Sequence, residues 1–582
     1  MRVEGPGLPD FDPNKNPAVF DTLTWDDRSL ASSVLSPPPE FWERVHTAVR
    51  KGEKPPKIPG LKLYEHSAGN LGNTSFILLE NDDGQHALAE FATRGEYVLI
   101  DEPLLCRELK NSAKAYFHEV NAWNLQRVYR KVAPVKLPQA LPSTPRLGIG
   151  TRMSRTVWPG IWRALAECPF TANAIQNSMR ELNLLEKIRS GEVGQQLYEP
   201  GIGFVPEGHT GSTFEGLWLC GVTEGLKSGI ARPYGADADH IMVKRDVEGL
   251  EKTRRVLVAA RYYSFFTIDV SDILDYSAFS AGGLPKVEPN LLDRCITDKK
   301  TRKEICAYYK KPLKMKGRSS GLSESELAAL VVKYWRAIDS LDVLIPFIKG
   351  LRVDGEPFDL ELSMDEHPPE IHPFDCLTSE IELAFVLEEM KRRGRSISHV
   401  APNLGIEKHF DYRYPDGPEG LEARTRALHE IAGGYGTVID CHSGDDLSRS
   451  TRQALKKATG GMIHFKISPY LQTLFADVLY DFDRRLFHTW WEDTCEFVRL
   501  NARQGSALAI SCLREYESDP GTGPHPKFAL FRLFCYATVG KRDPKGNFLF
   551  RDRFYSLTPE FFSEYSRRVK DYLCMLAGDV LP

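Results

Sequence analysis

The sequence predicts an α/β protein: a (β/α)8 TIM-type barrel with helical insertions, preceded by a small α+β domain. Beyond Pro145, short apolar segments typical of buried strands alternate with helical patterns. Strands that alternate with helices favour a parallel sheet with crossover helices. Eight such segments are present, which is the number that closes a barrel. They span Arg146–Gly150, Ala172–Gln176, Ala231–His240, Phe265–Asp269, Phe358–Ser363, Ile397–Asn403, Thr437–His442 and Met462–Lys466.

The chain divides into three regions. Residues 1–60 are rich in proline, aspartate and lysine, which predicts an extended N-terminal segment on the surface with one short helix near Pro39–Lys51. Residues 61–145 form the small α+β domain and a proline-spaced linker. Residues 146–582 hold the barrel, its insertions and a helical C-terminal tail. The expected elements of the small domain are strands over Asn73–Glu80 and Glu96–Asp101 and a helix over Leu109–Arg130.

Helical patterns fill the intervals between the predicted strands. The clearest is Ser379–Gly394, which opens with serine and acidic residues, ends in Lys-Arg-Arg and stops at glycine. A second helix is predicted over Leu421–Ala432. The long intervals Asn177–Ile230 and Asp272–Lys349 predict extra helices inserted into the loops of the barrel.

Composition limits the classes of partner. The net charge of −4 gives no basic field for nucleic acid or an anionic membrane, and no apolar run approaches the ~18 residues of a membrane span. The eleven cysteines are spread singly, which favours reduced thiols over a disulfide framework. The N-terminus has no apolar signal core. We expect a cytoplasmic protein without a nucleic-acid or membrane partner, and a homo-oligomer is an open possibility.

Histidines stand at the ends of three predicted strands. His240 ends the third strand, His442 ends the seventh, and His464 lies in the eighth. In a barrel the carboxyl ends of all strands meet at one face, where such enzymes place their sites. Three histidines from three strands can surround a divalent cation, which polarises a carbonyl or stabilises an enolate. We therefore predict a metal site of His240, His442 and His464, with Zn, Mn, Ni or Co as candidate ions.

Glu361 is the predicted catalytic residue. It lies in the fifth strand between Leu360 and Leu362, and apolar neighbours can raise a carboxyl pKa into the range useful for acid/base catalysis. Structural alternatives exist for these residues. A strand histidine is often a hydrogen-bonded core residue, and Glu361 can form an ion pair with a barrel lysine such as Lys466.

Seven stretches of the chain resemble the tagaturonate epimerase (UxaE) family, of which this sequence is a divergent member. Their order and spacing are kept from about Leu61 to the C-terminus. The stretches are RLGIGT at Arg146–Thr151, GADADHI at Gly235–Ile241, FTIDVSD at Phe266–Asp272, FDLELSMDE at Phe358–Glu366, EKHFDY at Glu407–Tyr412, HSGDD at His442–Asp446 and ATGGMIHFK at Ala458–Lys466.

The resemblance implies a metal-dependent barrel enzyme that interconverts the sugar acids tagaturonate and fructuronate. Glu361 is similar to the acid/base glutamate of the family, and the three histidines fall on histidines that the family keeps for its metal or site. The expected substrate-binding set combines three positions implied by the family with three polar residues that follow the sixth and seventh strands. It consists of Arg146, Gln176, Asn403, Ser443, Asp445 and Lys466.

Two positions depart from the family pattern. Pro145 replaces an aspartate expected as a second acid/base group, and Leu447 replaces a lysine suited to a substrate carboxylate. The loss of the lysine favours an alternative, a metal-dependent aldolase or isomerase acting on a neutral or phosphorylated ketose. The proline favours another, a non-catalytic sugar-binding relative.

The expected reaction is epimerisation by retro-aldol and aldol chemistry. The two ketohexuronates differ at a carbon one removed from the α position, so simple enolisation does not invert it. No GxGxxG motif joins a strand to a helix, so a nicotinamide-dependent oxidation is not supported. The residues favour a route in which a carbon–carbon bond is cleaved, the aldehyde fragment rotates, and the bond forms again.

Overall fold

A closed barrel of eight parallel strands organises the chain. The computed structural model describes residues 27–93, 100, 103–190, 196–199, 203–279, 291–317, 319–352, 355–365, 371, 373–519, 523–543 and 548–582. The strand order β12-β13-β14-β15-β16-β17-β6-β7 closes on itself, which confirms the predicted fold class. The strands are β6 (Arg146–Gly150), β7 (Ala172–Ser178), β12 (Gly235–Met242), β13 (Phe265–Asp269), β14 (Asp359–Ser363), β15 (His399–Ala401), β16 (Val438–Cys441) and β17 (Ile463–Ile467).

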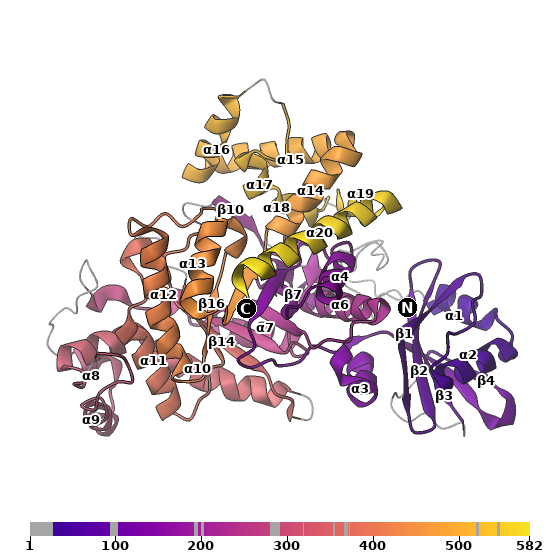
Figure 1. Cartoon of the computed structure of the whole chain (residues 1–582), viewed down its shortest axis with the longest axis horizontal. Helices are drawn as coiled ribbons and strands as arrows, with labels where there is room; N and C mark the ends of the chain where they lie inside the picture. Colours follow the sequence, from indigo (N-terminus) through magenta and orange to yellow (C-terminus); the bar gives the residue numbers. More distant parts are fainter. Residues whose placement is uncertain are drawn as a thin grey trace.

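Helices cover the outside of the barrel (Figure 1). The predicted helix at Ser379 is α11, and Ser379 and Glu382 form the capping box that its sequence indicates. The helices of this layer, α11 included, follow their strands in the alternating order of the sequence. They are α4 (Trp158–Glu167), α6 (Phe214–Ser228), α7 (Gly249–Ala259), α10 (Glu324–Leu351), α11 (Glu380–Arg392), α12 (Gly417–Gly433), α13 (Arg449–Thr459) and α14 (Tyr470–Phe482).

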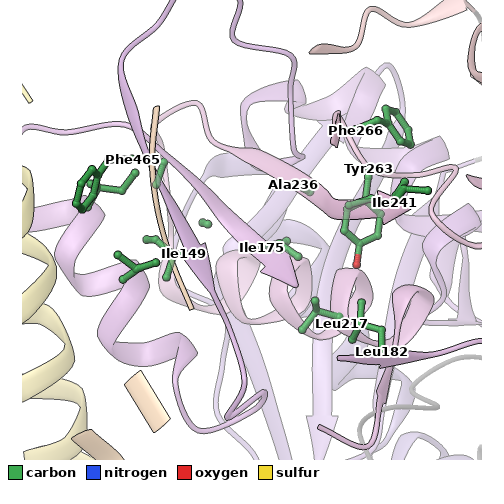
Figure 2. Packing of buried hydrophobic residues seen from close by; sticks show 14 of the residues in the cluster. Ile149, Ile175, Leu182, Leu217, Ala236, Ile241, Tyr263, Phe266 and Phe465 are labelled. Carbon is green, nitrogen blue, oxygen red and sulfur yellow. The ribbon is translucent and has the colours of Figure 1, made fainter. Parts of the chain in front are cut away.

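Apolar strand residues face this helical layer, whereas polar residues face the barrel axis. Ile149, Ile175 and Phe465 are fully buried and belong to the large apolar cluster around the strands (Figure 2). Because side chains alternate along a strand, His464 and Lys466 point to the opposite side of β17 from Phe465. The barrel interior is therefore filled by charged and hydrogen-bonding groups, which is the arrangement that builds the site.

The small domain is an antiparallel sheet of strand order β1-β2-β3-β5-β4 at one end of the molecule (Figure 1). Its strands are β1 (Leu61–Leu71), β2 (Thr74–Asn81), β3 (His86–Ala92), β4 (Leu105–Glu108) and β5 (Lys114–Glu119). Trp42 and Phe41 of α2 (Pro39–Lys51) pack with α1 (Asp27–Leu35) against the sheet. The helix predicted near Pro39–Lys51 is confirmed as α2, whereas α1 was not predicted.

The predicted helix over Leu109–Arg130 was wrong in its first half. Residues Lys114–Glu119 form β5, and α3 spans only Ala122–Val132. Pairing with β3 and β4 on both sides, together with burial of Ala115 and Phe117, outweighs local helix propensity here. The predicted strand over Glu96–Asp101 lies outside the described residues except for Ile100.

Insertions and a helical C-terminal region complete the fold. The β7–β12 interval holds β8 (Leu182–Asn183), α5 (Leu185–Ser190), β9 (Gln196–Glu199), β10 (Gly203–Pro206), β11 (Ser212–Thr213) and α6, and the β13–β14 interval holds α8 (Leu291–Cys295), α9 (Lys299–Tyr308) and α10. The C-terminal helices are α15 (Arg484–Arg503), α16 (Ala507–Glu517), α17 (Ala529–Phe534), α18 (Tyr536–Val539), α19 (Arg551–Tyr555) and α20 (Pro559–Val580). Among the described residues, no helix is long and apolar enough to cross a membrane.

A disulfide joins the C-terminal helix to the barrel layer. Cys168, directly after α4, is bonded to Cys574 of α20, and their Cα atoms are 5.9 Å apart. The other nine cysteines are free thiols. The expectation of reduced thiols throughout is corrected for this pair, which lies 406 residues apart in sequence. Spacing along the chain gives no signal for such a distant pairing.

Candidate active site

A cavity of about 140 Å³ opens at the carboxyl ends of the barrel strands. Its inner wall carries Gln176 from β7, Asp239 and His240 from β12, His442 directly after β16, and Lys466 from β17. This is the face where a parallel barrel brings its strand ends together. The structure therefore gathers most of the predicted polar residues at one place.

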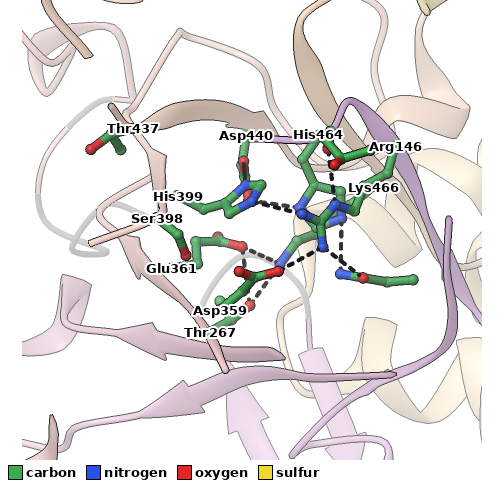
Figure 3. Close-up of polar contacts among 12 residues, drawn as sticks. Arg146, Thr267, Asp359, Glu361, Ser398, His399, Thr437, Asp440, His464 and Lys466 are labelled. Atoms are coloured by element: carbon green, nitrogen blue, oxygen red, sulfur yellow. Dashed lines mark hydrogen bonds and ion pairs between the residues drawn. The ribbon is translucent and has the colours of Figure 1, made fainter. Parts of the chain in front are cut away.

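Lys466 is the centre of the charge network inside the barrel (Figure 3). Its Nζ lies 2.5 Å from Glu361 Oε2, 2.8 Å from Asp239 Oδ1 and 3.0 Å from Asp237 Oδ2. It also donates to Thr267 Oγ1 at 2.7 Å. Burial alone would lower the pKa of Lys466, but the surrounding carboxylates hold it well above its usual value. This lysine is a permanent cation, already shared among three acids.

Glu361 is an ionised carboxylate in this network. Its Oε1 lies 2.8 Å from His442 Nε2, and its side chain is fully buried. Burial favours the neutral acid, but Lys466 and His442 outweigh it and hold the pKa of Glu361 well below the usual range. The expected upward shift was therefore wrong in sign. Leu360 and Leu362 alternate to the opposite side of β14, so Glu361 experiences the polar interior and not its apolar neighbours.

Asp239, His240 and His442 form the first candidate metal group. One ligand atom of each lies within 4.8 Å of the others, and all three residues line the cavity. His240 adopts φ 45° where the pairing of β12 with β13 shifts register, and this irregularity allows consecutive residues to serve one site. His240 Nδ1 lies 3.1 Å from Asp269 Oδ2, the supporting carboxylate typical of metal-bound histidines.

The donor set fits a divalent ion of the predicted kind. Two imidazoles and a carboxylate suit Zn, Mn, Ni or Co. His442 is held between Glu361 and Asp365, whose Oδ2 lies 2.9 Å from His442 Nδ1. Burial would lower the pKa of His442, but these two carboxylates raise it to about 10. His442 must therefore lose a proton before it binds a metal.

His464 belongs to a second and separate group with His399 and Asp440. The Nδ1 atoms of the two histidines each lie 2.7 Å from a different oxygen of Asp440. Their Nε2 atoms lie 3.2 Å from Arg146 Nη2 and 3.4 Å from Asn173 Nδ2. Every ring nitrogen thus has a protein partner, and burial lowers the pKa of both histidines so that they are neutral.

The predicted three-histidine centre is accordingly corrected. His464 precedes Lys466 by two residues on the same face of β17, so it lies one layer deeper in the barrel than the cavity wall. Asp239 takes its place beside His240 and His442. The signal for it was present in the sequence, because Asp239 directly precedes His240 at a strand end.

The predicted substrate-binding residues separate into two sets. Gln176, Ser443, Asp445 and Lys466 line the cavity. Gln176 Oε1 is buried and has no hydrogen-bond partner among the described residues.

Arg146 and Asn403 lie elsewhere. Arg146 begins β6 at the opposite end of the barrel, is fully buried, and pairs with Asp359 at 3.0 Å. Asn403 is buried and accepts from the backbone N–H of Gly405 at 2.9 Å. Both side chains make contacts that hold the fold together, and neither lines the cavity.

The two departures from the family pattern are also away from the cavity wall. Pro145 directly precedes β6, at the opposite end of the barrel from the mouth. Leu447 is only 2% exposed and packs in the apolar core. Neither residue contributes a group to the cavity, and neither position supplies the missing cation.

Sequence reasoning missed the outer wall of the cavity. Arg152 follows β6, Glu181 follows β7, His209 lies in the insertion before β11, and His409 lies in the loop after β15. These loop positions follow no periodic pattern, and only His409 lies in a stretch that resembles the family, Glu407–Tyr412.

Comparisons with known proteins agree with this architecture. The family model for tagaturonate epimerase matches residues 208–499, just over half of the 582 residues. The glycerol-complexed structure of fructuronate-tagaturonate epimerase UxaE from Cohnella laeviribosi is 18% identical, with a TM-score of 0.62 over 89% of this chain and 96% of that chain. A form with two glycerols is 17% identical, with a TM-score of 0.61 over 92% and 98%. Among curated proteins none matches.

Proposed function

Because the chain belongs to the tagaturonate epimerase family, a family of carbohydrate epimerases, we propose that it interconverts the ketohexuronates tagaturonate and fructuronate with the help of a divalent metal. The observation that carries this proposal is that Lys466 and His442, which line the cavity together with Asp239 and His240, both contact the buried carboxylate of Glu361. The proposal places the enzyme in the cytoplasm, with a small sugar acid as its substrate.

The reaction follows from the carbon that is inverted. Its C–H bond is not acidified by the ketone, so the bond to the carbon next to the ketone breaks instead. The hydroxyl on the inverted carbon loses its proton and becomes an aldehyde, while the electron pair of the broken bond forms an enediolate on the other fragment. Rotation of the aldehyde and re-addition restore the bond with inverted configuration, and no electrons are lost or gained.

Glu361 is the base that takes the hydroxyl proton. It is ionised because Lys466, which keeps its proton, stabilises its charge. Thr267 Oγ1 lies 3.1 Å from Glu361 Oε2 and 3.0 Å from Asp237 Oδ1, so it links these two carboxyl groups. Burial raises the pKa of Asp237 to about 7, which suits it to hold the proton until re-addition.

The metal group has a defined part in this scheme. Asp239, His240 and His442 would hold a divalent ion, which would supply Lewis-acid stabilisation of oxygen charge. Lys466 remains protonated. Its positive charge offsets the buried carboxylates around it, which would otherwise repel the negative charge of the enediolate. Pro145 lies at the other end of the barrel, so it does not favour a non-catalytic relative.

The test measures the turnover of the Glu361→Gln variant. NMR detects tagaturonate and fructuronate, and bound metal is measured in parallel. We expect kcat to fall roughly 10²–10⁴-fold while metal content is kept, because a positioned base contributes about that much. Glu389→Gln is the matched control, since Glu389 is fully buried and ion-paired to Arg392 outside the barrel. Near wild-type turnover in Glu361→Gln would remove Glu361 from the mechanism.

A further inference from the structure

Among the described residues, the cationic side chains of the inner half of the cavity, Lys466 and His442, are already paired with carboxylates. Lys466 is shared among Glu361, Asp239 and Asp237 at 2.5–3.0 Å. A fourth carboxylate there would compete with three that are already buried. If the substrate is a hexuronate, as the proposed function requires, its carboxylate needs a binding group elsewhere in the cavity.

The outer half of the cavity carries such groups. Arg152, Arg180 and Lys408 line it and come from the loops after β6, β7 and β15. Arg152 is held in place by its neighbours. Its Nε and Nη2 lie 2.9 and 2.8 Å from Glu181 Oε1, and its guanidinium lies over the ring of Tyr536 at 6.0 Å.

Glu181 is itself held in place. It accepts from Ser468 Oγ at 2.9 Å and from the backbone N–H of Ser178 at 3.2 Å. One edge of the Arg152 guanidinium is therefore fixed by a rigid partner, whereas no described residue pairs with Nη1. A guanidinium whose orientation is already set loses little entropy when it binds a carboxylate.

Two neutral histidines adjoin Arg152 in the same wall. Nδ1 of His209 and of His409 is buried without a hydrogen-bond partner among the described residues. Burial and nearby cations, Arg152 among them, lower the pKa of His209 to about 3 and that of His409 to about 4. Both rings are uncharged at neutral pH, and both residues line the cavity.

Glu181 is paired with Arg152, whereas two further acids of this wall are directed at backbone donors. Asp445 Oδ2 accepts from the backbone N–H groups of Ser468 at 3.2 Å and Tyr470 at 2.9 Å. Burial and Asp446 raise the pKa of Asp445 to about 7. Asp446 Oδ2 accepts from the backbone N–H of His409 at 2.9 Å. These carboxyl groups are directed at backbone donors.

We propose that Arg152 binds the carboxylate of the hexuronate, with His209 and His409 beside it, while the ketone end lies at Lys466 and Glu361. Arg152 thereby supplies the cation that Leu447 does not. In the retro-aldol reaction the aldehyde fragment carries the carboxylate. A single anchor at that end keeps the fragment in the cavity and leaves its aldehyde free to turn.

The test compares a uronate with its neutral counterpart in Arg152→Gln. We expect KM for tagaturonate to rise roughly ten-fold to hundred-fold, because a hydrogen-bonded charge pair is lost. The inhibition constant of tagatose, which has CH2OH in place of the carboxylate, should change less than about two-fold. Arg163→Gln is the matched control, since Arg163 pairs with Glu167 on the surface of α4 and is 47% exposed.

The outcomes separate this inference from the proposed function. Equal losses for tagaturonate and tagatose would assign Arg152 a structural role and overturn the inference, as would unchanged tagaturonate binding. Arg152→Lys keeps the positive charge but lacks the planar guanidinium. This variant should recover part of the affinity for tagaturonate even if Arg152→Gln folds poorly. A wild-type protein that neither binds nor converts tagaturonate refutes the proposed function, and this inference with it.

Discussion

Replacing Lys466 by methionine should destabilise the protein strongly at neutral pH. The substitution keeps an unbranched side chain but leaves Glu361, Asp239 and Asp237 buried together without their shared cation. Removing one partner of a buried ion pair costs roughly 3–5 kcal/mol, and here one cation serves three acids. We therefore expect the free energy of unfolding to fall by about 4 kcal/mol or more at pH 7.5.

The loss should shrink as pH falls. In the wild type, the pKa values of Asp239 and Glu361 lie below their unfolded values, so their stabilisation is present above about pH 4 and is lost below it. Without Lys466, these pKa values rise above the unfolded ones. The variant is then penalised above about pH 4, and the penalty is relieved as the carboxylates take up protons.

Urea unfolding at pH 7.5 and pH 5.5 measures both effects. Lys333→Met is the matched control, because Lys333 is equally buried but pairs with one carboxylate, Glu382, at 2.5 Å. The double variant Lys466→Met/Glu361→Gln should recover part of the loss. A Lys466→Met protein within about 1 kcal/mol of wild type at pH 7.5 would refute the charge network described for the barrel interior.

Three further predictions concern the metal group, the cavity wall and the disulfide. Asp239→Asn should lower the bound divalent metal measured by elemental analysis, whereas His464→Gln should keep it; the opposite result would restore His464 as a ligand. Because the pKa of His209 is lowered to about 3, the folded state does not take up the proton that the unfolded state binds below about pH 6.5. The wild type should therefore lose about 1.4 kcal/mol per pH unit relative to His209→Asn between pH 6 and pH 4, and parallel stability curves would contradict this. Peptide mapping without reductant should recover Cys168 linked to Cys574. Cys574→Ser should lower the free energy of unfolding by about 2–4 kcal/mol. Recovery of both cysteines as free thiols would show that the disulfide does not form.

The barrel could be predicted because its determinants are local and repeated. Each strand is a short apolar run that ends in polar residues, and β6 and β13 match their predicted limits. The capping box at Ser379 marks the start of α11 in the sequence itself. By contrast, β5 could not be predicted, since its conformation depends on pairing with strands that precede it in the chain.

The metal group shows the limit of the same reasoning. A strand-end histidine can face the cavity or lie one layer below it. These two positions are only two residues apart along the strand. His464 and Lys466 share a face of β17, but only Lys466 reaches the cavity. Depth in the barrel depends on the stagger of neighbouring strands, and the alternation of apolar and polar residues does not encode it. The irregular backbone at His240 is equally invisible in the sequence.

The cavity wall was beyond prediction for a different reason. Arg152, Glu181 and His209 come from loops and insertions, where no period relates sequence to position. Only the closure of the barrel brings them to the same cavity as Lys466. The substitution at Leu447 therefore looked like the loss of a cation, although the fold supplies arginine from another loop.

Epimerisation of tagaturonate in D2O tests the central claim most directly. The purified protein would be incubated with tagaturonate and a divalent metal, and the products followed by NMR. Retro-aldol chemistry in this cavity predicts that fructuronate forms without deuterium at the inverted carbon, because that carbon keeps its hydrogen throughout. Deuterium at the inverted carbon would contradict the mechanism, and the absence of fructuronate would contradict the proposed function.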